Sequence, residues 1–134
     1  MLEFLTKSFL LTFLKFAAVG FSGLLVDYGF TYLFKEIVKI QKYVANSIGF
    51  TLAASSNYIL NRIWTFESEN PEIVLEYTEF IAISLIGLVL NNAILWLIVS
   101  RLKWNFYFSK LIAIGVVTVW NFLANYFITF NQAI

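Results

Sequence analysis

The sequence contains no cysteine and no histidine among its 134 residues, and only one proline. These absences exclude disulfides, thiol nucleophiles, Cys or His metal sites and histidine acid–base chemistry. GxGxxG and GxxxxGK patterns are typical of loops that bind nucleotide phosphates, and the six glycines form neither of them. We therefore expect no metal and no cofactor.

Charge is also scarce, since charged residues make up 13% of the chain and the net charge is +1. No basic stripe interleaved with aromatics is present, so nucleic acid is not an expected partner. Hydrophobic residues make up 60% of the chain and aromatic residues 19%. Such a chain has too little polar surface to cover a water-soluble globule, so it falls in the membrane class. The apolar run near the N-terminus lacks a small-residue cleavage site, which argues against a removable signal peptide.

Apolar segments long enough to cross a bilayer occur four times, given that a spanning helix needs about 20 residues. They cover approximately residues 13–34, 43–66, 77–99 and 106–130. Strand-like alternation is missing, and a soluble bundle would need a polar face on each helix. The prediction is an all-α membrane protein with four transmembrane helices, in which neighbours joined by short gaps are antiparallel. Residues 1–12 form either a short interfacial helix or an extension of the first span.

An internal repeat appears when the chain is shifted by 64 residues, which places residues 16–66 on residues 80–130 without a gap. Twelve of the 51 aligned positions are identical, where chance at this composition gives roughly four. The identical pairs include Phe16/Phe80, Ala18/Ala82, Gly23/Gly87, Leu24/Leu88, Leu33/Leu97, Asn57/Asn121, Asn61/Asn125, Thr65/Thr129 and Phe66/Phe130. The sequence thus predicts one domain over residues 1–134, built from two hairpins in a parallel repeat. Transporters often bind substrate where such repeats meet.

Asp27 lies well inside the first apolar segment. A carboxylate at the bilayer centre costs about 2.5–3.5 kcal/mol on insertion scales, so it must be protonated, paired or turned toward a wet cavity. Asp27 is therefore a candidate functional residue. The alternative is a structural hydrogen bond to a neighbouring helix, worth about 0.6 kcal/mol on average.

Asparagines recur four residues apart in the second and fourth segments, which places each pair on one helix face. The pairs are Asn57 with Asn61 and Asn121 with Asn125. Amides that face a cleft suit sugar hydroxyls, because each offers two donors and an acceptor. Amides that bond neighbouring helices to each other are the equally weighted alternative.

Arg62 ends the second apolar segment, close to Trp64. One interpretation is a long side chain that reaches the membrane surface beside an aromatic belt. The other is a clamp for a lipid phosphate, because a guanidinium binds phosphate through two parallel hydrogen bonds. Lys15 and Lys110 could assist, and for Lys110 the surface-reaching interpretation is preferred.

Three passages carry a family resemblance: "KFAAVGFSGLLVDYGF" (residues 15–30), "SNYILNRIWTF" (residues 56–66) and "WNFLANYFITF" (residues 120–130). Together they resemble the GtrA-like membrane proteins, which also occur as the membrane domain of some dolichyl-phosphate mannose synthases. The resemblance covers nearly the whole chain. It implies four spans and a role in cell-surface polysaccharide synthesis or glycosylation, namely flipping a polyprenyl-phosphate-linked monosaccharide.

Carried over by this resemblance, the substrate-binding positions are Lys15, Asp27, Asn57, Asn61, Arg62 and Trp64. To these the repeat adds Asn121 and Asn125. Family members often have a basic residue where this chain has Tyr126, which is the repeat position of Arg62. A symmetric site with two cations is therefore not expected.

The location implied is the bacterial or archaeal inner (cell) membrane. The Lys and Arg count places the first and third loops in the cytoplasm, whereas the family resemblance implies cytoplasmic termini, and we adopt the latter.

The resulting hypothesis is a flippase component, without catalytic residues, that binds membrane lipid and a polyprenyl-phosphate sugar and could complete its pathway as a homodimer. A non-transporting anchor or partner of a membrane glycosyltransferase is the first alternative. A small proton-coupled exporter that uses Asp27 is the second, although the Asn-Arg-Trp ending gives it no support.

Overall fold

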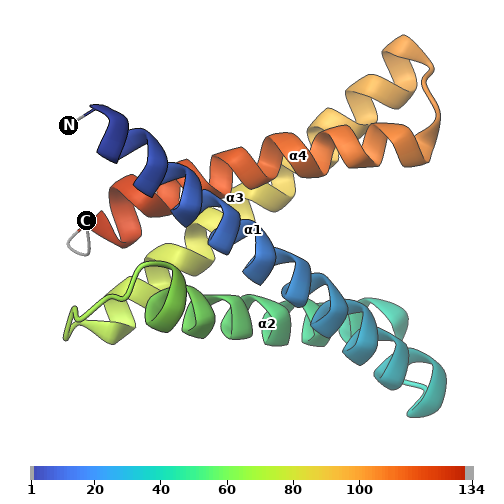
Figure 1. Ribbon diagram of the computed structural model, residues 1–134. Helices are drawn as coiled ribbons and strands as arrows, with labels where there is room; N and C mark the ends of the chain where they lie inside the picture. The colour runs from blue at the N-terminus through green and yellow to red at the C-terminus, as the bar shows by residue number, and fades with distance from the viewer. Residues whose placement is uncertain (1, 132–134) are drawn as a thin grey trace. The chain divides into compact units, whose positions relative to one another are not determined.

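The computed structural model describes residues 2–131, and within them it contains helices and no strand (Figure 1). The α-helices are α1 (Leu2–Tyr32), α2 (Lys42–Leu60), α3 (Ile73–Leu97) and α4 (Phe106–Ala124). Each continues into a single π-helical turn, and these are η1 (Leu33–Ile37), η2 (Asn61–Thr65), η3 (Ile98–Leu102) and η4 (Asn125–Thr129). The predicted all-α class is confirmed.

The first and third helices extend beyond the predicted segments. α1 begins at Leu2, so residues 2–12 lengthen the first helix and do not form a separate one. α3 begins at Ile73, ahead of the predicted Tyr77, and places Glu76 in its first turn. Lys35 and Arg101 lie in the last turns of η1 and η3. Acidic residues near a helix N-terminus and basic residues near its C-terminus complement the helix dipole, which is why these charges do not end the helices.

Equivalent side chains begin α2 and α4. The Gln41 Oε1 atom accepts the backbone N–H of Val44 at 2.9 Å, and the Asn105 Oδ1 atom accepts that of Phe108 at 3.2 Å. Both are side-chain caps for N–H groups that have no partner within the helix. Gln41 and Asn105 are 64 residues apart, so the capping position follows the sequence repeat.

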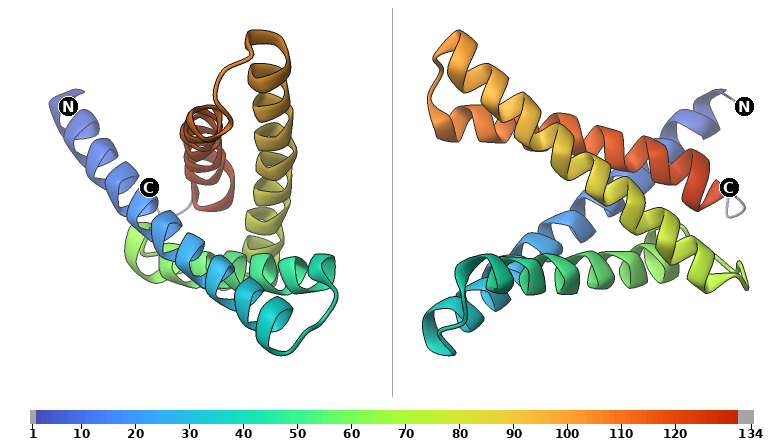
Figure 2. Two further views of the ribbon diagram at one scale, coloured as in Figure 1. Left: turned by 90° about the vertical axis from the view of Figure 1, so that its right-hand side faces the viewer. Right: turned by 180° about the vertical axis from the view of Figure 1, so that it is seen from behind.

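The chain divides into two compact units, Met1–Glu69 and Asn70–Ile134. The first contains the antiparallel pair α1 and α2, and the second contains the antiparallel pair α3 and α4 (Figure 2). In each unit a short connection joins the two helices, at residues 38–41 and 103–105.

Aromatic contacts close each unit at the end opposite its short connection. The rings of Phe16 and Phe66 meet edge-on, with centroids 6.3 Å apart and planes at 67°. The rings of Phe80 and Phe130 meet in the same way, at 6.4 Å and 66°. All four phenylalanines are buried, so these pairs are part of each hairpin's own core.

Glycines bring the helices of each unit close together deeper in the hairpin. A methyl group added at Gly23 would lie 2.6 Å from the Nδ2 atom of Asn57, and one added at Gly87 would lie 2.7 Å from the Oδ1 atom of Asn121. Neither distance is compatible with an ordinary contact, so the absence of a side chain is what allows the asparagine to fit at both positions.

Three helical segments are long and apolar enough to cross a membrane: Lys7–Ile37, Ile73–Leu102 and Phe108–Thr129. Three of the four predicted spans are therefore supported. The segment formed by α2 and η2 falls outside this group because amides and hydroxyls lower its hydropathy. These side chains are Asn46, Ser47, Ser55, Ser56, Asn57 and Asn61.

Candidate functional site

Lys15 of α1 and Trp64 of η2 are brought together by the first hairpin. The Lys15 Nζ atom lies 5.4 Å from the centroid of the Trp64 ring, within the range of a cation–π interaction. Trp64 is 46% exposed, so this contact lies at the surface of the protein. Because Arg62 lies two residues before Trp64 on the same turn, two cationic residues lie near this end of the unit.

Arg62 is half-buried, and its Nη1 atom donates to the Ser68 Oγ atom at 3.4 Å. The carbonyl oxygen of Arg62 accepts the backbone N–H of Ser68 at 2.8 Å. The π-helical turn η2 is therefore followed by a segment that Arg62 holds in place through both its carbonyl oxygen and its side chain, at Ser68. This arrangement orients the guanidinium at the end of the helix, where a phosphate group could reach it.

The residues Asn57, Asn61 and Thr65 follow one another at intervals of four along one face of the second helix, and we call them the first-unit stripe. Asn61 is 1% exposed and Thr65 is 7% exposed. The Oδ1 atoms of Asn57 and Asn61 and the Oγ1 atom of Thr65 are buried and have no hydrogen-bond partner within the part of the chain that the structure describes. The first-unit stripe therefore presents three unpaired oxygen atoms.

The corresponding residues Asn121, Asn125 and Thr129 form the second-unit stripe. The Thr129 Oγ1 atom donates to the Asn125 Oδ1 atom at 2.8 Å, and the Asn125 Nδ2 atom donates to the backbone carbonyl of Asn121 at 2.7 Å. Asn125 is fully buried. Only the Oδ1 atom of Asn121 is unpaired in this stripe among the described residues.

Asp27 is half-buried, and its Oδ1 atom accepts a hydrogen bond from the Thr31 Oγ1 atom at 3.0 Å. Gly49 of α2 faces both residues, since a methyl group there would meet them at once. Twelve residues separate Lys15 from Asp27, which corresponds to about 18 Å along a helix axis. The structure therefore separates Asp27 from the cluster of Lys15, Trp64 and Arg62, and Asn57 lies at an intermediate level opposite Gly23.

The sequence pattern places Thr65 on the same helix face as Asn57 and Asn61, but Thr65 was not among the predicted substrate-binding residues. The available signal was its position four residues after Asn61 and its recurrence as Thr129. The Lys15–Trp64 contact had no signal in the sequence, because 49 positions separate the two residues and only the packing of the hairpin joins them.

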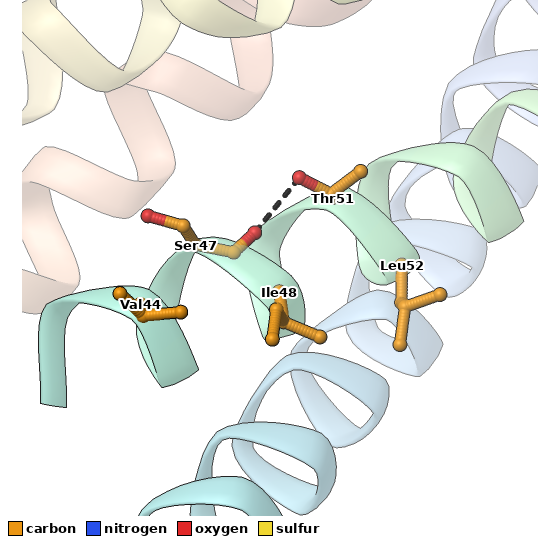
Figure 3. Close-up of a pocket in the computed structure, with 5 residues that line it drawn as sticks. All are labelled: Val44, Ser47, Ile48, Thr51 and Leu52. Carbon is orange, nitrogen blue, oxygen red and sulfur yellow. Dashed lines mark hydrogen bonds between the residues drawn. The ribbon is translucent and has the colours of Figure 1, made fainter. Parts of the chain in front are cut away.

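A shallow hollow of about 460 Å³ lies along α2, on the stretch that also contains Gly49 (Figure 3). It is lined by Val44, Ser47, Ile48, Thr51 and Leu52. The Thr51 hydroxyl in it already donates to the Ser47 carbonyl at 2.8 Å, so the hollow offers little to a polar ligand. Within the described residues, no group of three or more acidic side chains could hold a metal ion.

One curated relative is a dolichol-phosphate mannosyltransferase from Pyrococcus furiosus, which is 34% identical over 85 residues. The match covers 63% of this chain and 24% of the relative, so the chain spans only about a quarter of that protein's length.

The family model for the GtrA/DPMS transmembrane domain matches residues 15–130. This range includes every residue predicted to bind substrate and both hairpins from Lys15 onward. Together with the three apolar helices, the match identifies an integral membrane protein. The chain therefore belongs to the family of GtrA/DPMS transmembrane domains, as the resemblance in its sequence predicted.

Proposed function

We propose that this protein binds a polyprenyl-phosphate-linked monosaccharide and takes part in moving it across the membrane. The observation that carries the proposal is the placement of Lys15 over Trp64, beside the turn that carries Arg62. Two cations near one end of a membrane hairpin suit a lipid phosphate, because hydrogen bonds between cations and phosphate are strong. The link of the family to polyprenyl-phosphate sugars supports the choice of substrate.

The depth of these residues follows from helix length. The 23 residues from Lys15 to Ile37 span about 34 Å, close to the roughly 30 Å of a bilayer's hydrocarbon core. Lys15 then lies at headgroup depth when Ile37 lies at the opposite surface, and Asp27 lies near the middle. Residues Lys42–Thr65 span about 36 Å, so we propose that the second helix also crosses the membrane despite its amides.

Each residue then has a defined role. Arg62 binds the phosphate with help from Lys15, which Trp64 holds in place. The amides of Asn57 and Asn61 bind sugar hydroxyls, and Asp27 positions or gates the sugar on its way across. The prenyl chain stays in the bilayer, and because no bond is made or broken, the protein acts without catalysing a reaction.

The proposed location is the inner (cell) membrane of a bacterium or archaeon, with both termini in the cytoplasm. The two units are proposed to be copies of one hairpin in a single domain, and a homodimer would supply enough helices for a complete pathway. Labelling of a single cysteine introduced near residue 70 tests the orientation. Reaction only from the outside would contradict cytoplasmic termini, because residue 70 follows two proposed spans and therefore lies on the same side as the termini.

The direct test is transport of a fluorescent polyprenyl-phosphate mannose between leaflets by purified protein in liposomes. Wild-type protein should move the lipid, and Arg62→Ala and Asp27→Asn should each slow the movement. Tyr126→Ala, at the repeat position of Arg62, is the matched control and should leave the rate unchanged. The mechanism is wrong if Arg62→Ala and Asp27→Asn both transport at the wild-type rate.

A second candidate is a non-transporting membrane anchor or partner for a glycosyltransferase. The observation in its favour is that the Pyrococcus furiosus relative is named as a mannosyltransferase and is about four times as long as the matched region. Co-purification with a transferase, combined with no lipid movement in liposomes, would favour this candidate over the flippase.

A further inference from the structure

The two stripes have the same sequence pattern, N-x-x-x-N-x-x-x-T, but differ in their hydrogen bonds. In the second-unit stripe, Asn125 is bonded through both its oxygen and its nitrogen, and Thr129 is one of its partners. In the first-unit stripe, the Asn61 Oδ1 and Thr65 Oγ1 atoms have no partner among the described residues, although both side chains are more than nine-tenths buried. Asn61 and Thr65 of the first-unit stripe are thus unpaired at the positions where the second-unit stripe has hydrogen-bonded side chains.

Buried polar atoms without a partner are uncommon, and each requires an explanation such as a bound ligand or water. The unpaired atoms in the first-unit stripe are oxygens, and the carbonyl oxygens of Asn57 and Asn61 can only accept hydrogen bonds. A phosphate, which offers acceptors, is therefore a poor ligand for these atoms. A group rich in hydroxyl donors fits them.

We propose that the first-unit stripe alone binds the hydroxyl groups of the sugar, with Thr65 as an additional contact, whereas the second-unit stripe only holds its hairpin together. This inference rests on the proposed function and narrows it, because it removes Asn121 and Asn125 from the substrate site. Thr65 lies one turn after Arg62 on the same helix end, which sets the sugar contacts next to the phosphate contact.

Entry of the sugar requires α1 to move away from α2 at the level of the stripe. On the α1 side of this interface Gly23 lies against Asn57, and it has no side chain whose packing would be lost. The stripe extends about 12 Å from Thr65 to Asn57, so it leads from the end of the helix toward the middle of the membrane. A sugar that follows it moves inward while the phosphate remains near Arg62.

The test compares Thr65→Val with Thr129→Val, since each change removes one hydroxyl and nearly preserves shape. Binding of polyprenyl-phosphate mannose and of sugar-free polyprenyl phosphate is measured on purified protein in nanodiscs, alongside thermal unfolding. Thr65→Val should weaken binding of the mannose lipid by about fivefold to tenfold, the effect of one lost hydrogen bond. It should leave binding of the sugar-free lipid and the melting temperature unchanged. Thr129→Val should lower the melting temperature and leave both affinities unchanged.

Asn61→Leu and Asn125→Leu form a second matched pair. Asn61→Leu should weaken binding of the mannose lipid, whereas Asn125→Leu should lower the melting temperature and leave both affinities unchanged. The inference is overturned if Thr65→Val and Asn61→Leu bind the mannose lipid as wild type does, or if both lipids lose affinity equally. It is also overturned if Thr129→Val weakens binding of the mannose lipid as much as Thr65→Val. If the wild-type protein still binds the sugar-free lipid in these cases, the proposed phosphate site stands. If the wild-type protein binds neither lipid, the proposed function is overturned as well.

Discussion

The two hairpins share their packing contacts and differ in their charged residues. The edge-on phenylalanine pairs and the glycine–asparagine contacts recur at a spacing of 64 residues. The charged and aromatic residues of the candidate site do not recur, since Glu79, Tyr126 and Ile128 occupy the repeat positions of Lys15, Arg62 and Trp64. These packing contacts are therefore common to both units, while the cationic cluster is specific to the first.

The hairpins also differ in how closely their helices approach near the short connection. In the first unit, a methyl group added at Gly49 would lie 2.7 Å from the Asp27 carbonyl oxygen. The repeat position in the second unit is Ala113, which carries that methyl group and is fully buried. The first hairpin is thus tighter at the level of Asp27, and the difference follows the change from glycine to alanine at the repeat position.

The largest effect is expected for Gly49→Ala, which places a methyl group against the backbone of Asp27. A backbone atom cannot rotate away, so we expect a loss of about 3 kcal/mol in the free energy of unfolding, at the upper end for overpacking. Thermal or denaturant unfolding in detergent measures it. Ala113→Gly is the matched control and should cost only about 1 kcal/mol, the helix penalty of glycine. Equal losses in the two variants would contradict the closer approach in the first unit.

Exchange of Arg62 and Tyr126 tests the asymmetry of charge. Arg62→Tyr should weaken binding of polyprenyl phosphate by about tenfold to a hundredfold, because hydrogen bonds to charged groups contribute about 1.5–3 kcal/mol. Adding Tyr126→Arg should not restore binding, since the second unit has Glu79 and Ile128 in place of Lys15 and Trp64. Lipid binding in nanodiscs measures both variants. Full recovery in the double variant would show that the two units are interchangeable.

A double-mutant cycle between Lys15→Met and Trp64→Leu isolates the cation–π contact. We expect a coupling of about 0.5–1 kcal/mol in the free energy of unfolding, as measured for exposed pairs of this kind. The cycle at the repeat positions, Glu79→Met with Ile128→Leu, should show no coupling because neither a cation nor an aromatic ring is present. A first-unit coupling near zero would remove the proposed role of Trp64 in holding Lys15.

The smallest effect is expected at Lys39 and Lys103, where the two units should behave alike. Both residues are in the left-handed region, with φ of 64° and 56°, and they are 64 residues apart. Glycine relieves this conformation, so Lys39→Gly and Lys103→Gly should each stabilise the protein by at most about 1 kcal/mol. Thermal unfolding that shows opposite signs for the two variants would contradict the equivalence of these turns.

Much of the fold could be predicted from the sequence, because hydropathy and helix formation are local properties. The apolar runs gave the helices, and the repeat of Asn57, Asn61 and Thr65 gave positions that structure places on equivalent faces. The ends of the helices were less predictable. Charged residues such as Lys35 and Arg101 marked expected loops, yet the last turns widen and include them.

The candidate site was predictable as a set of residues and not as an arrangement. Lys15, Trp64 and Arg62 were chosen for their chemistry, but the contact between Lys15 and Trp64 depends on the antiparallel packing of α1 and α2. Asp27 was grouped with them in sequence, and the length of α1 separates it from them. Gly49 was not singled out, because its importance lies in what faces it.

The sequence by itself determined that this protein is a membrane-embedded helical chain with a repeated amide pattern, since composition and spacing are readable without coordinates. The tertiary structure decided in which of the two identical stripes the second asparagine and the threonine are hydrogen-bonded to each other. Hydrogen bonds typically join donors and acceptors about 2.7–3.2 Å apart, and such distances depend on how the surrounding helices pack. For this reason Thr129 bonds to Asn125 in one unit, while Thr65 and Asn61 remain unpaired in the other.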